Sequence, residues 1–236
     1  MTQFAFVDTP LGDALVLHRM VAREQLGRLF TVRLELLAKK GDVAFKDLIG
    51  KPMTVHLQQS AGGTREWNGI VSDLAHVRSH GRQIVYGATL RPKLWLLSHR
   101  TNCRIFQDMS VPDIASEILR EHGVTDVDVA LTESYAVRDY CVQYRESDFA
   151  FISRLFEQVG IYYYFEHQNS KHILRIVDAP SAHKPTAPYA EIVYRPFTGN
   201  QVDVVEAVTQ WSVSESLEPG SVVLDDFDFV KPKADL

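Results

Sequence analysis

Two pairs of side chains in this 236-residue sequence have types and spacings that could support chemistry. Glu146 and Asp148 are a carboxylate pair of the kind used in general acid–base catalysis. Their place at the start of an expected helix favours a structural role, because acidic groups complement the positive end of the helix dipole. His76 and His80, four residues apart, would share one face of a helix and could hold a metal ion there. They lie at the end of an expected strand, where that spacing does not bring imidazoles together, so solvated turn histidines are favoured.

Three aspartates near the end of the sequence could form a calcium site. Asp225, Asp226 and Asp228 carry the carboxylate oxygens that Ca²⁺ prefers. Phe227 and Phe229 alternate with them, and this alternation is typical of a half-buried strand. We therefore expect a strand with one wet face here.

The aromatic run Tyr162–Phe165 could stack on a sugar or a base, but such a run is more often a buried strand with tyrosine hydroxyls at its rim. Cys103 and Cys141 are too few for a disulfide scaffold and lack metal-ligand spacing, so two unpaired thiols are expected. Phosphate-loop, dinucleotide-binding and nucleophile-elbow motifs are absent from the sequence. We therefore predict no catalytic, cofactor-binding or metal-ligating residue, and no cofactor.

The composition is that of a folded protein, with 45% hydrophobic and 23% charged residues. Lys and Arg total 25 against 30 Asp and Glu, a net charge of -5, and the basic residues are scattered, so a nucleic-acid partner is not indicated. No apolar run approaches the ~20 residues that span a bilayer, which excludes an integral membrane segment. The first residues have neither the basic region nor the apolar core of a Sec signal peptide, so synthesis in the cytoplasm without one is expected.

The first hundred residues are expected to form mainly strands. Val32, Leu34 and Leu36 alternate with polar residues, which gives this stretch the two-residue period of a strand with one dry face. Residues 45–49 predict a short helical turn, and further strands are predicted at 53–59, 65–77 and 82–91. Many short strands with tight turns favour an antiparallel barrel or sandwich.

Two helices are predicted in the middle of the chain. The first begins at Ser110 with an N-cap, an early proline and an acidic residue, and Gly123 ends it. The second begins at Ser147 and is ended by Gly160; its apolar side comprises Phe149, Ile152, Leu155, Phe156 and Val159. Strands that pair as a hairpin are expected after it, at 161–165 and 173–177, which makes this region α+β.

The sequence changes character near residue 181. Residues 181–188 contain prolines and small polar residues and predict a linker or domain edge. Strands are expected after it, around 191–194, 202–214 and 221–230. The roughly fifty residues there are too few for an independent core, so we expect them to be part of a domain.

Several sequence blocks occur in a fixed order along the chain. The most specific runs from Tyr144 to Glu166 and reads YRESDFAFISRLFEQVGIYYYFE. The others are Arg23–Phe30, Leu48–Pro52, Trp67–Val71, Cys103–Gln107 and Asp225–Pro232. Together they resemble the signature blocks of the valine-glycine repeat protein G (Rhs-element Vgr) family, the spike proteins of type VI secretion systems. The resemblance covers essentially the whole chain.

The resemblance implies an α+β, mainly β fold like that of the phage tail hub, in which antiparallel β-barrel tube domains carry an inserted α+β domain. On this chain it implies a first barrel at 1–100, an insertion with two helices at 101–185, and the incomplete start of a second barrel at 186–236. Full-length members continue through an OB-fold domain and a needle. We therefore expect a truncated member, a fragment or the base of a split spike.

The resemblance also implies partners and a location. It implies a homotrimer when full-length, docking on the hexameric inner-tube protein (haemolysin-coregulated protein), contacts with baseplate components, and effectors or adaptors bound through C-terminal parts. A protein of this family is secreted by the type VI apparatus, out of the cell or into a target cell. The implied role is structural rather than enzymatic. The alternatives are a tail hub of a prophage or contractile particle and, from another class, a cell-wall or glycan hydrolase.

Overall fold

The computed structural model describes residues 4–38, 43–59, 62–80, 83–185, 189–196, 207–221, 223 and 230–232, with only the backbone at 80 and 83. The chain forms two compact units, Met1–Ala190 and Glu191–Leu236. The finer division of the chain at residues 100 and 185 remains a prediction.

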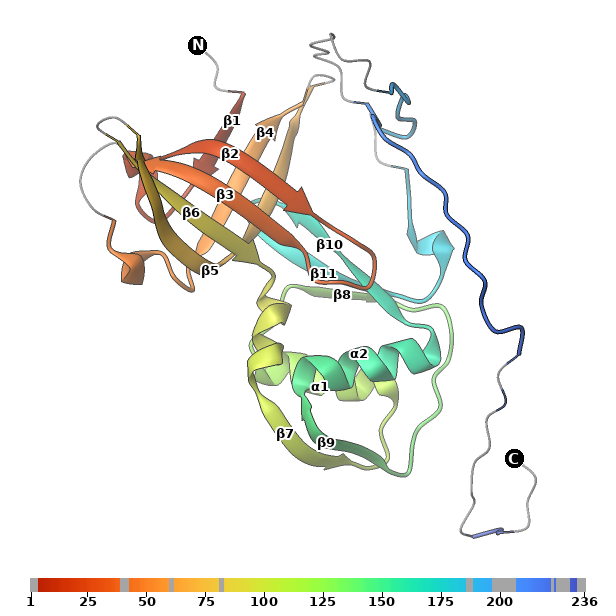
Figure 1. Ribbon diagram of the computed structural model, residues 1–236. Coiled ribbons are helices and arrows are strands. Elements are labelled where there is room, and N and C mark those ends of the chain that lie inside the picture. Colours follow the sequence, from red (N-terminus) through yellow and green to blue (C-terminus); the bar gives the residue numbers. More distant parts are fainter. Residues whose placement is uncertain are drawn as a thin grey trace. The chain divides into compact units, whose positions relative to one another are not determined.

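Six strands of the first unit form one antiparallel sheet that curls into a nearly closed barrel (Figure 1). Its order is β1-β4-β5-β6-β3-β2, and the two end strands, β1 and β2, contact each other. The strands are β1 Ala5–Asp8, β2 Leu15–Arg23, β3 Thr31–Ala38, β4 Pro52–Gln58, β5 Thr64–His80 and β6 Gln83–Arg91. Short 3₁₀ helices lie at Gly12–Ala14 and Phe45–Asp47. The predicted antiparallel barrel is confirmed.

The barrel interior follows from the two-residue period of its strands. Val32, Leu34 and Leu36 of β3 are almost fully buried in the barrel core, whereas Arg33 between them is exposed. Gly62 and Gly63 have φ angles of 94° and 92° in the β4–β5 turn, a region of φ that side chains with a Cβ rarely adopt.

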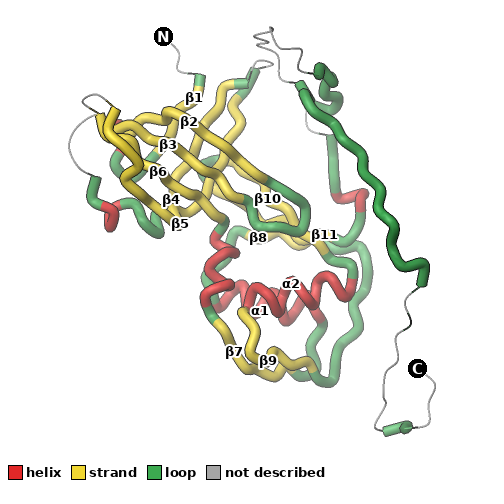
Figure 2. Tube along the Cα trace, in the orientation of Figure 1, coloured by secondary structure: helices red, strands yellow, loops and turns green. Residues whose placement is uncertain are grey.

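The rest of the first unit is an α+β body beside the barrel (Figures 1 and 2). A 3₁₀ helix, η3, at Lys93–His99 leads from the barrel into it. Its helices are α1 Val111–Glu121 and α2 Asp148–Val159, and its strands are β7 Thr101–Phe106, β8 Val127–Ala130, β9 Cys141–Ser147, β10 Tyr162–Gln168 and β11 Lys171–Val177. β7 and β9 pair antiparallel, while β10, β11 and β8 form a second sheet in which β11 and β8 are parallel. A further 3₁₀ helix lies at Pro180–Ala182.

Both predicted helices are confirmed, and their ends are set by local chemistry. Ser110 and Asp113 form a reciprocal capping box at the start of α1. The Ser147 hydroxyl accepts a hydrogen bond from the Ala150 N–H at the start of α2, and Gly160 ends it with a φ of 75°.

The buried side of α2 differs from the predicted one. Phe151 is fully buried and its ring stacks on that of Phe106, while Phe149 and Val159 are only half-buried at the margin of the same core. The difference arises because α2 packs against α1, β9 and η3 at once, so more than one stripe is covered.

The described part of the second unit carries less regular structure than predicted. Within residues 191–196 and 207–221 the described backbone contains an isolated parallel bridge between Tyr194 and Val208, in place of the strand expected at 191–194 and of the described part of the strand expected at 202–214. A strand needs a hydrogen-bonding neighbour, and in this part only the bridge provides one. The predicted strand residues Asp225, Asp226 and Asp228 lie outside the described residues.

Candidate functional site

The hairpin β10–β11 of the α+β body packs against barrel strand β5, and this contact is the first candidate site (Figure 1). Phe30 is buried at its centre, with its ring edge-on to the rings of Phe165, His167 and His172. Phe165 packs against both the barrel core and the core of the α+β body. We call the polar residues around Phe30, namely Glu24, Trp67, Asn68, His167 and His172, the barrel–hairpin joint.

Asn68 is the centre of the joint. Its amide nitrogen donates to Thr54 Oγ1 at 2.9 Å, and its Oδ1 lies 2.8 Å from His172 Nδ1. The backbone N–H of Lys93 donates to His172 Nε2 at 3.0 Å. An imidazole nitrogen that accepts a hydrogen bond carries no proton, so in His172 Nδ1 carries the proton and donates to Asn68. One imidazole therefore ties β11 to β5 and to η3.

His172 is fixed in its neutral form. Burial is the main cause that lowers the pKa of His172 to about 4, and the electrostatic interactions with the neighbouring His167 and Lys93 act in the same direction. A second proton would have to sit on Nε2, which already accepts the Lys93 N–H. Protonation of His172 therefore works against the joint.

Glu24 closes the other side of the joint. His167 accepts the Asn68 backbone N–H on Nδ1 at 3.0 Å, and its Nε2 lies 3.3 Å from Glu24 Oε1. Trp67 Nε1 and Arg65 Nη2 donate to Glu24 Oε2 at 3.0 and 2.9 Å. Burial alone would raise the pKa of Glu24, but the hydrogen bonds from His167 and Trp67 and the charge of Arg65 outweigh it and lower the pKa.

The joint gathers three of the signature blocks. Glu24, Gly27 and Phe30 come from the first block, and the N–H of Gly27, whose φ is 67°, donates to the Tyr163 carbonyl at 2.7 Å. Trp67, Asn68 and Gly69 come from another block. Phe165 lies in the third block, and His167 directly follows that block. Blocks that are distant in sequence therefore meet at one contact between the barrel and the hairpin.

A second cluster surrounds Asp148, whose side chain is 0% exposed. Its Oδ2 lies 2.9 Å from Arg100 Nε and 2.7 Å from His122 Nε2, and Gln143 Nε2 donates to its Oδ1 at 2.7 Å. Arg100 also binds Glu121 at 2.6 Å. The Asp148 cluster therefore ties α2 to α1, to β9 and to the start of β7.

The structure separates the predicted carboxylate pair. Glu146 binds Arg154 at 2.7 Å, whereas Asp148 points into the buried cluster. The expectation that Asp148 serves the helix dipole was incomplete, because its carboxylate contacts side chains from three other parts of the chain, while Ser147 supplies the cap. The sequence signal that could have found this cluster is an aspartate at the first position of a helix that is already capped.

The other predicted residues lie apart from these clusters. His76 is exposed on β5 with its ring edge-on to Tyr86. Cys103 is exposed and Cys141 is buried, and both are free thiols. The aromatic run forms most of β10, as predicted; Tyr163 is buried, which raises the pKa of its hydroxyl, and Tyr162 is half-buried.

The joint and the Asp148 cluster are built to hold elements together. Their described carboxylates and imidazoles face protein groups at hydrogen-bond or ion-pair distance. Among the described residues, no three or more His, Cys, Asp or Glu side chains are grouped as a metal site would need. No helix in the described ranges is long and apolar enough to cross a membrane.

Comparison with known proteins places the fold. The profile of the phage tail baseplate hub (GPD) family matches residues 23–236. The chain is 44% identical to the type VI secretion system spike protein VgrG1a of Pseudomonas aeruginosa and 42% identical to VgrG1b of the same organism. Both matches cover 100% of this chain, but they cover only 37% of VgrG1a and 32% of VgrG1b. The chain thus spans about a third of the length of these curated relatives.

A solved structure agrees in fold. An E. coli component of the type VI secretion system, c3393, described as structurally similar to the bacteriophage tail proteins gp27 and gp5, superposes with a TM-score of 0.64 at 22% identity. The match covers 78% of this chain and 52% of c3393. Spike proteins of type VI secretion systems are therefore homologues of this chain, and its fold is that of the tail hub proteins.

Proposed function

Because the chain belongs to the phage tail baseplate hub (GPD) family, we propose that it forms the hub at the base of a type VI secretion spike. The observation that carries the proposal is the 44% identity to a spike protein over the whole chain. In this role the chain contributes a rigid base that docks on the secretion tube and is expelled with it. The first tube barrel would occupy residues 1–100, the insertion 101–185, and the start of a second barrel 186–236.

The role is structural and not catalytic. Acid–base catalysis needs a carboxylate or imidazole that is free to exchange a proton with a substrate. The side chains of Asp148, Glu24 and His172 instead form hydrogen bonds or ion pairs with other groups of the protein. This arrangement supports a scaffold and argues against the hydrolase alternative.

Assembly would follow the hub plan. Three copies, each with two similar barrels, present six near-equivalent faces that can meet a six-subunit tube ring without a break in symmetry. The partners are then the hexameric inner-tube protein and baseplate components, and the assembled spike is secreted by the type VI apparatus. Effectors or adaptors would bind other parts of the full-length protein.

A tail hub of a prophage or contractile particle is the second candidate. It is favoured by the family profile itself and by the likeness of the fold to phage tail proteins. Both candidates predict the same fold and differ in the particle that contains it.

The test is a deletion in the bacterium that encodes the chain. Removal of its gene should abolish release of the inner-tube protein into the medium, and the wild-type gene should restore release. Unchanged release would refute the spike proposal; loss of phage-like particles in its place would support the second candidate. Release of fragments from peptidoglycan by the purified chain would support the hydrolase.

A further inference from the structure

The two-stranded sheet β7–β9 has an outer face of exposed apolar side chains. Phe106 and Cys141 point inward and are buried against the helices. Because side chains alternate along a strand, Ile105, Val142 and Tyr144 point to the other side, and they are 58%, 39% and 65% exposed. Ile105 and Val142 are direct cross-strand neighbours, and Tyr144 is opposite Cys103.

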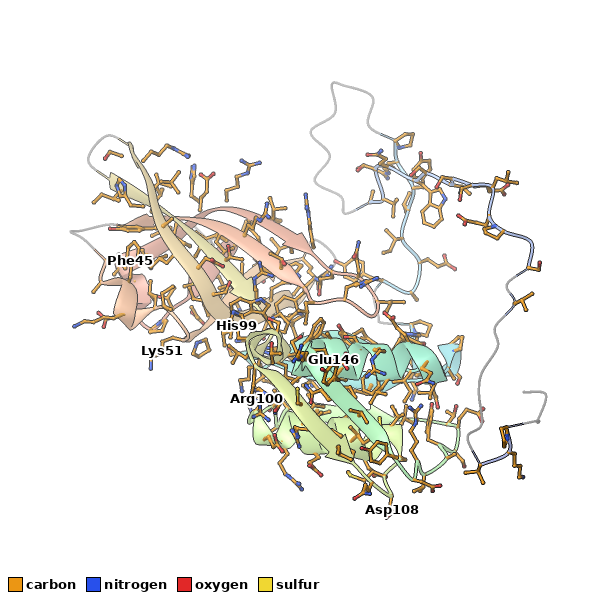
Figure 3. The ribbon with its side chains drawn as sticks, turned by 60° about the horizontal axis from the view of Figure 1, so that its bottom comes forward. Phe45, Lys51, His99, Arg100, Asp108 and Glu146 are labelled. Carbon is orange, nitrogen blue, oxygen red and sulfur yellow. The ribbon has the colours of Figure 1, made fainter. Side chains whose placement is uncertain are left out.

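Barrel strand β3 shows what a solvated outer face looks like in this protein. It buries Val32 and Leu34 on one side and carries Arg33 and Glu35 on the other. β7–β9 instead has apolar residues on both sides, a pattern typical of a sheet covered on both faces. In Figure 3 these strands lie in front of the helices, with Arg100 and Asp108 marking the two ends of β7.

Arg145 marks one edge of this face. It is the extra residue of a β-bulge, since Asn102 pairs with Glu146 and Cys103 with Tyr144. Its φ of 51° is a conformation that costs about 1 kcal/mol or more for a residue other than glycine. The bulge holds the Arg145 guanidinium 5.2 Å from the centre of the Tyr144 ring.

The charge of Arg145 is not balanced by a neighbour. In the described part of the chain Arg145 has no hydrogen bond or ion pair, whereas Arg100, Arg104 and Arg154 are each paired with a carboxylate. Tyrosine and arginine are the residue types enriched at interaction hot spots. A partner that covers this face would gain by supplying a carboxylate to Arg145.

We propose that the outer β7–β9 face, made of Cys103, Ile105, Val142, Tyr144 and Arg145, binds an extended segment of another protein that carries apolar side chains beside an acidic one. A second copy of this chain could occupy the face only by supplying a carboxylate from another part of its surface, and the concentration dependence below tests for that occupant. The inference is independent of the proposed function and stands or falls separately.

The probe is a pair of labelled extended peptides, one alternating Leu with Glu and the other alternating Leu with Lys. Binding to the intact chain is measured by fluorescence anisotropy, and alkylation of the two cysteines is followed by mass spectrometry. Cys103 lies on the face and is exposed to the reagent, whereas buried Cys141 serves as the internal reference. We expect the acidic peptide to bind and to slow alkylation of Cys103, and the basic peptide to bind at least tenfold more weakly.

Variants separate binding from folding. Arg145→Gly removes the guanidinium while favouring the positive φ, so the thermal unfolding midpoint should be unchanged or higher and affinity for the acidic peptide should fall about tenfold. Ile105→Ser, at an exposed position, should also weaken binding. The control Arg33→Ala removes an exposed arginine from the polar face of β3 and should leave affinity unchanged.

Four results would overturn the proposal. They are absence of binding by the acidic peptide, equal binding of both peptides, equal affinity of the Arg145→Gly and Arg33→Ala variants, and a Cys103 alkylation rate that the acidic peptide does not change. Protection of Cys103 that rises with the concentration of the chain alone would assign the face to a second copy. Protection only by phosphatidylglycerol vesicles would assign it to a membrane surface.

Discussion

Replacement of Gly69 by alanine tests whether the barrel–hairpin joint is as tightly packed as it looks. Gly69 lies on β5 next to Asn68, and a Cβ there would be 3.0 Å from the Arg91 carbonyl oxygen, 3.1 Å from Leu90 Cβ and 3.2 Å from a ring carbon of Phe30. The Arg91 oxygen and the Leu90 Cβ can move only with the backbone of β6. The Phe30 ring is buried among three other rings. The barrel or the hairpin must therefore shift.

The expected change in the free energy of unfolding follows from two opposing effects. Overpacking costs about 1–3 kcal/mol, and replacing glycine by alanine returns about 0.4–1 kcal/mol by restricting the unfolded chain. We therefore expect Gly69→Ala to lower the free energy of unfolding by about 1–2 kcal/mol and the Tm by about 2–8 °C, measured by calorimetry and urea denaturation.

Gly87→Ala is the matched control on the neighbouring strand. A Cβ at Gly87 would meet only the Cγ2 of Val77, at 3.1 Å, and Val77 is about half exposed and can turn aside. This variant should be neutral or slightly stabilising. If Gly69→Ala is as stable as Gly87→Ala, the close packing inferred at the joint is wrong.

Three further changes test the core, the joint and the Asp148 cluster. Phe156→Ala should lower the free energy of unfolding by about 3–5 kcal/mol in urea titrations, because a large buried side chain is lost. His172, with a pKa of about 4 when folded against about 6.5 unfolded, binds its proton more readily in the unfolded chain. Stability should therefore be full above pH 6.5 and fall by about 3 kcal/mol towards pH 4, and His172→Gln should remove this part of the pH dependence. Asp148→Asn should cost about 1–3 kcal/mol at pH 7, because a neutral amide cannot accept all the hydrogen bonds that Arg100, His122 and Gln143 direct at the buried carboxylate.

Local patterns were sufficient to predict much of the fold. Alternation identified β3, and the capping residues Ser110 and Ser147 identified the starts of both helices, because these signals depend only on near neighbours in sequence. The β10–β11 hairpin followed from β-propensity directly after Gly160. The resemblance supplied the hub-like architecture that periodicity alone left open between barrel and sandwich.

The polar clusters could not be predicted from local patterns. Asn68 and His172 are 104 residues apart, and each looks like an ordinary strand residue until the hairpin is folded onto β5. The same holds for Asp148, whose partners Arg100 and His122 come from separate elements. Phe151 was missed because a single apolar stripe was assumed where the helix is covered on several sides.

The most direct test of the hub assignment is electron microscopy of the spike assembled from the full-length protein that contains this chain. The account predicts three copies of residues 1–236 in a closed ring at the base of the spike, with barrel ends facing the tube. Light scattering on the same protein should give a trimer. A stable dimer, or density for this region away from the ring, would contradict the account.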